Sequence, residues 1–472
     1  MRAFFSRQSM LGLCTALVFS ISLACGGGSG SKTNNNGTPA PGGANPGGTG
    51  STTAGTTTGS GTGTGGSTTG GSTTGTTSGG TSSGTGGSTT GGGSGSGTGG
   101  GTTGGNGSPH GSGFLYVANN GSEQNIGGTI SAFSINTETG ELTAVAGSPF
   151  QAGQAPFSIT STVDGQFVFV GDGRATIGVR GANCSLFHGV LLVERVDKTT
   201  GALTQTDKKE LDGVCPNAVA VDPSGARVYV GMDTFNRTQL GEIQIFQYSP
   251  TGTLTEMPGS PVLLDQFVSD ITFDPNGSNL YVATEQDGSG ILVLKHDRTT
   301  GALAPQSIVN VGQQTHISVD FTVGVATSGF QGGKILSFHR EQNGDLTAAS
   351  TIQASLPLGV AIQSGLVAVT EMENSSDFPG GISMFKINNS TGTLTSVPGS
   401  PFPDGHFPDD VKFEIGRDQY VFAVSRNDGT VSSYRSDIVS AGLTPVNGSP
   451  WKAGDNPLAL TIVRFNNPNN IP

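Results

Sequence analysis

The chain has 472 residues and a formal net charge of −12 at pH 7. Its first 112 residues contain three basic residues (Arg2, Arg7 and Lys32) and no acidic one, so residues 113–472 carry all 34 acidic residues against 19 basic ones. A domain with this balance repels phosphate backbones, which disfavours nucleic acid as a partner. The acidity is compatible with binding of cations or basic partners, and equally with a role in solubility alone.

Residues 1–25 have the form of a bacterial export signal. Two arginines lie in the first nine residues, and residues 10–24 form an apolar run that is short for a membrane span. The segment ends in Ser22-Leu23-Ala24-Cys25, which resembles the lipobox of bacterial lipoproteins. That resemblance implies that Cys25 is lipidated on its thiol and becomes the mature N-terminus, and Gly26 resembles members sent to an outer membrane. Cleavage by an ordinary signal peptidase at the same bond is the alternative.

Residues 26–112 consist almost entirely of Gly, Ser and Thr. With so few large apolar side chains, burial cannot offset the entropy lost on ordering, so we expect a disordered N-terminal tether. A Gly-rich coil of this length has an end-to-end distance of roughly 50 Å. The segment either holds the following domain away from a membrane or is a dispensable low-complexity expansion.

A turn of the form Thr-Gly-x-Leu recurs through residues 113–472. The glycines of its seven copies are 61, 51, 49, 43, 48 and 50 residues apart, with only strand-like segments between them. This period predicts an all-β fold, a seven-bladed β-propeller with one four-stranded blade per repeat. Gly-Ser-Pro recurs four times and is expected to end the outermost strand. The seven turns are Thr139-Gly140, Thr200-Gly201, Thr251-Gly252, Thr300-Gly301, Asn343-Gly344, Thr391-Gly392 and Ala441-Gly442.

The order of strands predicts how the ring closes. By comparison with the other copies, Phe114–Ala118 is the second strand of a blade, Thr129–Ile135 the third and Leu142–Val145 the outermost. Pro457–Phe465 matches the innermost strand of the other copies. We therefore expect the C-terminal strand to complete the N-terminal blade, which leaves no free sheet edge in the ring.

Several motifs together resemble the lactonase-type seven-bladed β-propeller family, which includes a 6-phosphogluconolactonase branch and cycloisomerase-like members. They are Leu115-Tyr116-Val117-Ala118-Asn119 and Leu280-Tyr281-Val282-Ala283-Thr284, similar to the Tyr-Val-Thr-Asn (YVTN) repeat strand, with Thr-Gly-x-Leu and Gly-Ser-Pro-Phe. The resemblance covers about residues 113–465 and implies a possible lactone hydrolase. The segments that lead into the innermost strands lack the Arg-His pair expected of enzymatic members, and Thr315-His316 keeps a histidine alone.

The candidate site is the face where the central channel opens, because loops from every blade converge there. A lactone hydrolase needs a base to activate water and a cation to hold the developing oxyanion. The sequence offers His316 or Glu285 as the base and Arg426 or Arg174 as the cation. Every one of these residues has a structural alternative as an ordinary polar loop residue. The other candidates on this face are Gln154, Asn217, Asp270, Asp409, Asn456, Asn119, Asp172, Asp233, Glu371, Glu373 and Asp428.

Two cysteines remain after the signal, Cys184 and Cys215. Both are expected on the channel-mouth face of an exported protein, so we predict a disulfide that closes the long excursion Gly171–Gly189. The sequence contains no phosphate-cradling glycine loop and no calcium-loop pattern, so no cofactor and no metal is expected. Glu371-Met372-Glu373 with Asp377 is a weak candidate for a cation.

Two functions remain open from the sequence. The first is a ligand- or protein-binding module, displayed on the cell envelope by a lipid anchor and a tether, and monomeric. Its partner would be a small molecule or an envelope protein at the channel-mouth face. The alternative is an exported hydrolase of a lactone or sugar acid, similar to 6-phosphogluconolactonase.

Overall fold

Short strands joined by tight turns account for the regular structure of the computed structural model. It describes residues 113–122, 127–173, 188–234, 240–285, 289–329, 333–372, 380–414, 420–437 and 439–465. The expected signal (1–25) and linker (26–112) lie outside these residues. Within them, no helix is long and apolar enough to cross a membrane.

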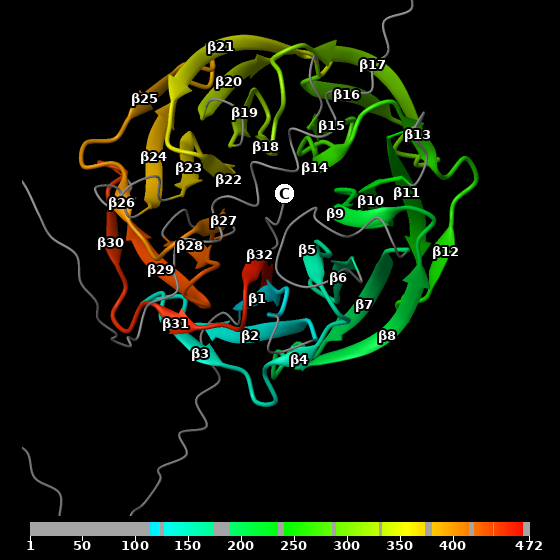
Figure 1. The fold of residues 1–472 in the computed structure, drawn as a ribbon, viewed down its shortest axis with the longest axis horizontal. Coiled ribbons are helices and arrows are strands. Elements are labelled where there is room, and N and C mark those ends of the chain that lie inside the picture. Colours follow the sequence, from blue (N-terminus) through cyan, green and yellow to red (C-terminus); the bar gives the residue numbers. More distant parts are fainter. Residues whose placement is uncertain are drawn as a thin grey trace, which may run out of the picture. The chain divides into compact units, whose positions relative to one another are not determined.

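The strands form seven antiparallel sheets arranged as blades around a central channel (Figure 1). Within each blade, strand A is innermost and strand D outermost. The first four blades contain, from A to D, β32 (Pro457–Arg464), β1 (Gly113–Asn119), β2 (Thr129–Ile135), β3 (Leu142–Ala144) and β4 (Phe150–Gln151); β5 (Pro156–Ser161), β6 (Phe167–Asp172), β7 (Val190–Val196) and β8 (Leu203–Glu210); β9 (Val214–Val221), β10 (Arg227–Asp233), β11 (Gly241–Tyr248), β12 (Leu254–Glu256) and β13 (Val262–Leu264); β14 (Val268–Phe273), β15 (Asn279–Thr284), β16 (Ile291–His296) and β17 (Leu303–Val309).

The last three blades follow the same order. They contain β18 (His316–Val319), β19 (Val323–Ser328), β20 (Lys334–Arg340) and β21 (Leu346–Gln353); β22 (Pro357–Gln363), β23 (Leu366–Glu371), β24 (Gly381–Ile387), β25 (Leu394–Ser396) and β26 (Phe402–Pro403); β27 (Pro408–Phe413), β28 (Tyr420–Ser425), β29 (Thr430–Ser436), β30 (Leu443–Pro445) and β31 (Trp451–Lys452). The prediction of a seven-bladed β-propeller with four-stranded blades is confirmed.

The ring closes as the sequence predicts. Strand β32 pairs antiparallel with β1, from Gly113 opposite Arg464 to Asn119 opposite Pro457. Figure 1 shows the red β32 beside the blue-cyan β1, although the two lie at opposite ends of the propeller sequence. A buried ion pair between Glu414 of the seventh blade and Arg464 of β32 adds to this closure.

The apolar core lies between blades rather than inside any one of them. Alternating strand residues point toward the preceding and the following blade, and every pair of neighbouring blades shares an apolar cluster. In the cluster of the seventh and first blades, for example, Leu115 and Val117 pack with Phe422 and Val424. Burial of these side chains is the main force that holds the blades together.

The Thr-Gly turn and the Tyr-Val strand are two halves of one contact between blades. The hydroxyls of Tyr116, Tyr229 and Tyr281 donate hydrogen bonds to the carbonyls of Gly201, Gly301 and Gly344 in the turn of the next blade, at 2.9, 2.9 and 2.7 Å. The turn glycines have positive φ, for example 81° at Gly301. A Cβ there would lie 2.5 Å from Cδ of Arg227 in the preceding blade, so both conformation and space require glycine.

Two details of the repeat differ from the sequence prediction. Gly-Ser-Pro interrupts strand D rather than ending it, because β4, β13, β26 and β31 resume pairing with the same strand C. The serine hydroxyl accepts the strand C amide that the interruption leaves, as Ser148 does from Ala132 at 2.9 Å. In the seventh blade the residue with positive φ is Ala441, at 64°, and not Gly442.

Candidate functional site

The innermost strands of all seven blades enclose a cavity of about 420 Å³ in the central channel. Several of its lining residues are small, such as Ala218 of β9, Ala361 of β22 and Ala459 of β32. Because these side chains extend little into the channel, the space is open to a small ligand.

Titratable side chains occupy one position of this wall in three blades. Asp270 of β14, His316 of β18 and Asp410 of β27 each lie four residues before the residue that begins the turn to strand B. All three line the cavity. The sequence singled out Asp270 and His316 as candidates on this side but missed Asp410 and, two residues later, Lys412.

The Asp270 carboxylate is fixed by backbone amides. Its Oδ2 accepts a hydrogen bond from the amide of Ile317 in the next blade at 3.0 Å, and its Oδ1 accepts one from the amide of Ile271 at 2.8 Å. Burial raises the pKa of Asp270 to about 6, against the lowering effects of the Ile317 amide and the Lys412 charge. The carboxyl group is therefore mostly ionised at pH 7 and titrates near the physiological range.

Asp410 and Lys412 form an ion pair on the wall of the seventh blade. Lys412 Nζ lies 2.6 Å from Asp410 Oδ1, and the other carboxylate oxygen accepts the amide of Leu460 in β32 at 3.0 Å. The Lys412 side chain is 42 % exposed, whereas that of Asp410 is 8 % exposed. The ammonium group is therefore accessible from the cavity while its partner is held against the backbone.

The three residues predicted to be catalytic lie in different settings. His316 is the first residue of β18 and lines the cavity. Glu285 follows β15. Burial, together with the charge of Glu285, raises the pKa of Asp233 in the preceding blade to about 8. Arg426 follows β28 in the seventh blade. Their catalytic role stays a prediction.

Arg426 is engaged in structural contacts. Its Nε donates to the buried carboxylate of Asp409, and its guanidinium carbon lies 4.6 Å from the centre of the Phe407 ring. Cation–π stacking and the ion pair both hold the side chain in place. The guanidinium is therefore partly committed before any ligand binds, which weakens its case as an oxyanion-binding group.

Three further candidates fix loops that lead into strand A. Asp172 Oδ1 accepts the amides of Gln154 and Ala155 at 3.0 and 2.6 Å. Glu371 Oε2 accepts the amide of Ser355 at 2.6 Å, and Asp428 Oδ2 that of His406 at 2.7 Å. The polar residues that stood out in these loops therefore have structural partners.

Several predictions fall on residues outside the described ranges. Arg174, Cys184, Glu373 and Asp377 lie there, as does Cys25. Cys215 is buried in β9, and the predicted disulfide Cys184–Cys215 stays a prediction because Cys184 is not described. In the described part of the chain, no group of three or more His, Cys, Asp or Glu side chains is placed to hold a metal ion.

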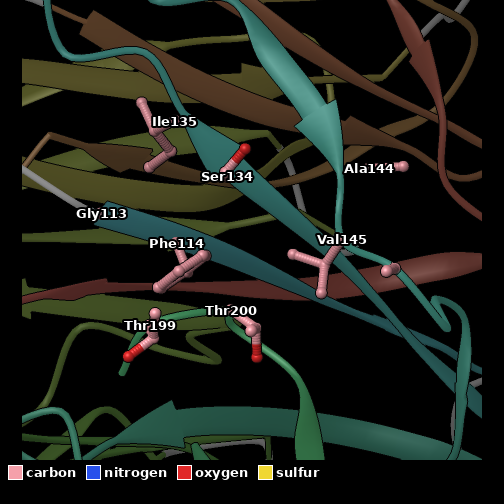
Figure 2. A pocket seen from close by; sticks show the side chains of 9 residues that line it. Gly113, Phe114, Ser134, Ile135, Ala144, Val145, Thr199 and Thr200 are labelled. Carbon is pink, nitrogen blue, oxygen red and sulfur yellow. The ribbon is translucent and has the colours of Figure 1, made fainter. Parts of the chain in front are cut away.

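A second cavity, of about 240 Å³, lies between the first blade and the turn of the second (Figure 2). Figure 2 shows Phe114, Ile135 and Val145 on one side and the hydroxyls of Thr199 and Thr200 on the other. None of its lining residues is titratable. It lacks the acid–base chemistry of the channel, so the channel is the stronger candidate site.

Comparison with known proteins supports the fold. No family model and no curated protein matches the chain. Among solved structures, a Bacteroides uniformis protein described as a candidate 6-phosphogluconolactonase is 18 % identical, with 75 % of this chain and 99 % of that one covered and a TM-score of 0.59. The periplasmic gluconolactonase PpgL of Pseudomonas aeruginosa is 15 % identical, with 74 % and 99 % covered and a TM-score of 0.58.

A similar protein from Bacteroides fragilis, also described as a candidate 6-phosphogluconolactonase, is 16 % identical over 75 % of this chain and 98 % of that one, with a TM-score of 0.59. At such identities, structural likeness establishes the fold and leaves the chemistry to the site residues. The likeness therefore establishes the β-propeller fold of the chain and nothing further.

Proposed function

We propose that this chain is an exported, lipid-anchored binding protein whose central channel takes a small polar ligand. The observation that carries the proposal is the 420 Å³ cavity, lined by strand A of every blade and bearing Asp270, His316, Asp410 and Lys412. Pockets of this size with a few convergent polar groups are the usual sites of small ligands. The commitment of Arg426 to Asp409 favours binding over hydrolysis.

Export and anchoring rest on the N-terminal sequence. The apolar segment before Cys25 and the Gly/Ser/Thr stretch after it are typical of tethered envelope proteins. A protein of similar fold, PpgL, is described as periplasmic. Cys25→Ser should release the protein from the membrane fraction and abolish labelling by a radioactive fatty acid. Unchanged labelling would contradict the anchor.

A channel-filling variant tests the binding site. Ser318 of β18 lines the cavity and is partly exposed, so Ser318→Phe should occupy ligand space, whereas Ser318→Ala should not. We expect ligand-induced stabilisation, measured by thermal shift over a library of small polar metabolites, to disappear in the phenylalanine variant alone. Binding that survives Ser318→Phe would place the ligand elsewhere, such as an envelope protein on the outer surface.

The alternative is an exported hydrolase of a lactone or sugar acid. Its support is the position of His316 on the channel wall beside the strand that holds Asp270, together with the gluconolactonases among proteins of similar fold. Hydrolysis of a panel of sugar lactones tests it. Rates that vanish in the His316→Ala/Glu285→Ala double variant would favour the enzyme. Absence of hydrolysis across the lactone panel would favour the binding protein.

A further inference from the structure

The channel wall carries opposite charges on opposite sides. Asp270 belongs to β14 of the fourth blade and Lys412 to β27 of the seventh. Figure 1 shows these two strands facing each other across the centre of the ring. Both residues line the same cavity of about 420 Å³. A ligand in the channel therefore meets an acidic wall and a basic wall.

Each charge is held by its own blade or by the next one, not by the other charge. Asp270 accepts the amides of Ile317 and Ile271, and Lys412 is paired with Asp410 at 2.6 Å. Among the described residues, Asp410 is the acidic side chain with which Lys412 forms an ion pair. Such groups are fixed in advance of ligand binding, which lowers the entropy lost when a ligand binds.

The two charges nevertheless influence each other through the cavity. The Lys412 ammonium lowers the pKa of Asp270 against the larger effect of burial, and the neighbouring Asp410 carboxylate raises it. Lys412 Nζ keeps further N–H donors beyond the one that its contact with Asp410 requires, because an ammonium group has three. An ionised Asp270 likewise has lone pairs beyond the two that accept amides.

The rest of the wall leaves room for a ligand with both charges. Ala218, Ala220 and Ala361 add little bulk, and Thr160, Thr272 and Ser318, which also line the cavity, carry hydroxyl groups. A ligand with an anionic group alone would pair with Lys412 but lie close to two carboxylates. A ligand with an ammonium and a carboxylate satisfies both walls.

We propose that the channel binds a zwitterion of the amino-acid or short-peptide class, with its ammonium group at Asp270 and its carboxylate at Lys412. This inference rests on the proposed function, because it names the ligand of the same cavity. Charge-assisted contacts at both ends would give selectivity over ligands that carry a single charge.

The test is isothermal titration of the full chain with alanine, dialanine and trialanine, each also as the N-acetyl and the C-amide form. The three lengths distinguish a free amino acid from a peptide. We expect the zwitterion of one length to bind, and each blocked form to bind about ten-fold more weakly or worse.

Variants assign each end. Asp270→Asn should weaken zwitterion binding and remove the discrimination against the N-acetyl form, and Lys412→Met should remove the discrimination against the C-amide. Lys386→Met is the matched control, because Lys386 is an exposed lysine of the outer part of the sixth blade whose ammonium donates to the Val439 carbonyl. Equal binding of zwitterion and blocked forms, or binding indifferent to both channel variants, would overturn the inference.

Failure of the inference is separable from failure of the proposed function. Suppose that no zwitterion binds, but that a neutral or anionic metabolite binds the wild-type protein and not Ser318→Phe. This result would refute the proposal of a zwitterionic ligand and would still support the channel as the binding site. Absence of any ligand whose binding Ser318→Phe removes would refute both.

Discussion

The turn side of the propeller and the wall of its channel follow opposite rules. On the turn side, the same contact recurs in three blades, where a tyrosine hydroxyl donates to a glycine carbonyl in the turn of the next blade. On the channel wall, equivalent positions hold Asp270, His316 and Asp410 in three blades and small residues in others. Repeated residues mark contacts that pack one blade against the next, and departures from the repeat mark residues with a role in a single blade.

The largest expected loss of stability comes from breaking the ion pair between Glu414 and Arg464, which helps to close the ring. Glu414→Gln leaves the Arg464 guanidinium buried without its partner, so unfolding free energy should fall by about 3–5 kcal/mol. Urea unfolding of the full chain measures this. The double variant Glu414→Gln/Arg464→Met should recover most of the loss. A single variant as stable as wild type would show that closure depends on the β1–β32 pairing alone.

A smaller effect, a gain in the free energy of unfolding, is expected at a position where one blade departs from the apolar repeat. Glu194 of β7 is 2 % exposed and occupies the position held by Phe or another large side chain in the other six blades. Those residues are Phe133, Phe246, Leu294, Phe338, Phe385 and Tyr434. Burial raises the pKa of Glu194 to about 7, so the folded state favours the protonated form.

The stability that protonated Glu194 contributes is present at low pH and is lost as pH rises from about 4.5 to about 7. Glu194→Leu removes that penalty and should therefore stabilise the protein by about 2–3 kcal/mol at pH 8, and by much less at pH 4.5. Unfolding curves at the two pH values measure the difference. Glu210→Leu, an exposed position of the neighbouring strand β8, is the control and should show little pH dependence. An equal effect of Glu194→Leu at both pH values would contradict the argument.

A glycine and an alanine at equivalent turns sharpen the comparison further. Gly301→Ala must adopt φ near 81° and places a Cβ against Arg227, so a loss of about 1–2 kcal/mol is expected. Ala441 already occupies this conformation in the seventh blade, and Ala441→Gly should cost nothing or stabilise by less than about 1 kcal/mol. Thermal melting distinguishes the two. A loss in both variants would mean that side-chain burial, not conformation, governs the turn.

The smallest effect on stability is expected on the channel wall. Lys412 is 42 % exposed, so Lys412→Met should change the unfolding free energy by less than about 1 kcal/mol. Its charge lowers the pKa of Asp270, so that pKa should rise above its present value of about 6. Carboxyl-carbon NMR titration measures the shift, with Lys386→Met as the reference. An unmoved Asp270 pKa would show that the two walls do not interact.

The fold could be predicted from the sequence because the turn motif that marks each blade occurs seven times. The turn spacing gave the number of blades, and the order of strands at the two ends gave the pairing of β32 with β1. The disagreements arise where a motif has more than one possible place in the ladder. Gly-Ser-Pro looks like the end of a strand, and only the hydrogen bond from Ala132 to Ser148 shows that the strand continues.

The site was harder to predict, because the channel-facing register cannot be counted along the sequence. Strand A contains a β-bulge in several blades, for example between Pro408 and Asp410 in β27. The bulge shifts which residues face the channel, and simple alternation then misplaces Asp410 and Lys412. The sequence analysis selected acidic residues of the loops as site candidates instead. Two of them, Asp172 and Glu371, accept hydrogen bonds from backbone amides.

The pairing of β1 with β32 also sets an order of events during synthesis. Strand β1 leaves the ribosome before the other strands of the propeller, but its inner neighbour β32 comes last among the described strands. Until then the first blade exposes an unpaired inner edge, and the blades on either side of it cannot lock the ring. A partly synthesised propeller is therefore an open ring whose exposed strand edge is prone to pair with other chains. Pairing of β32 with β1 is the step that closes the ring within one molecule.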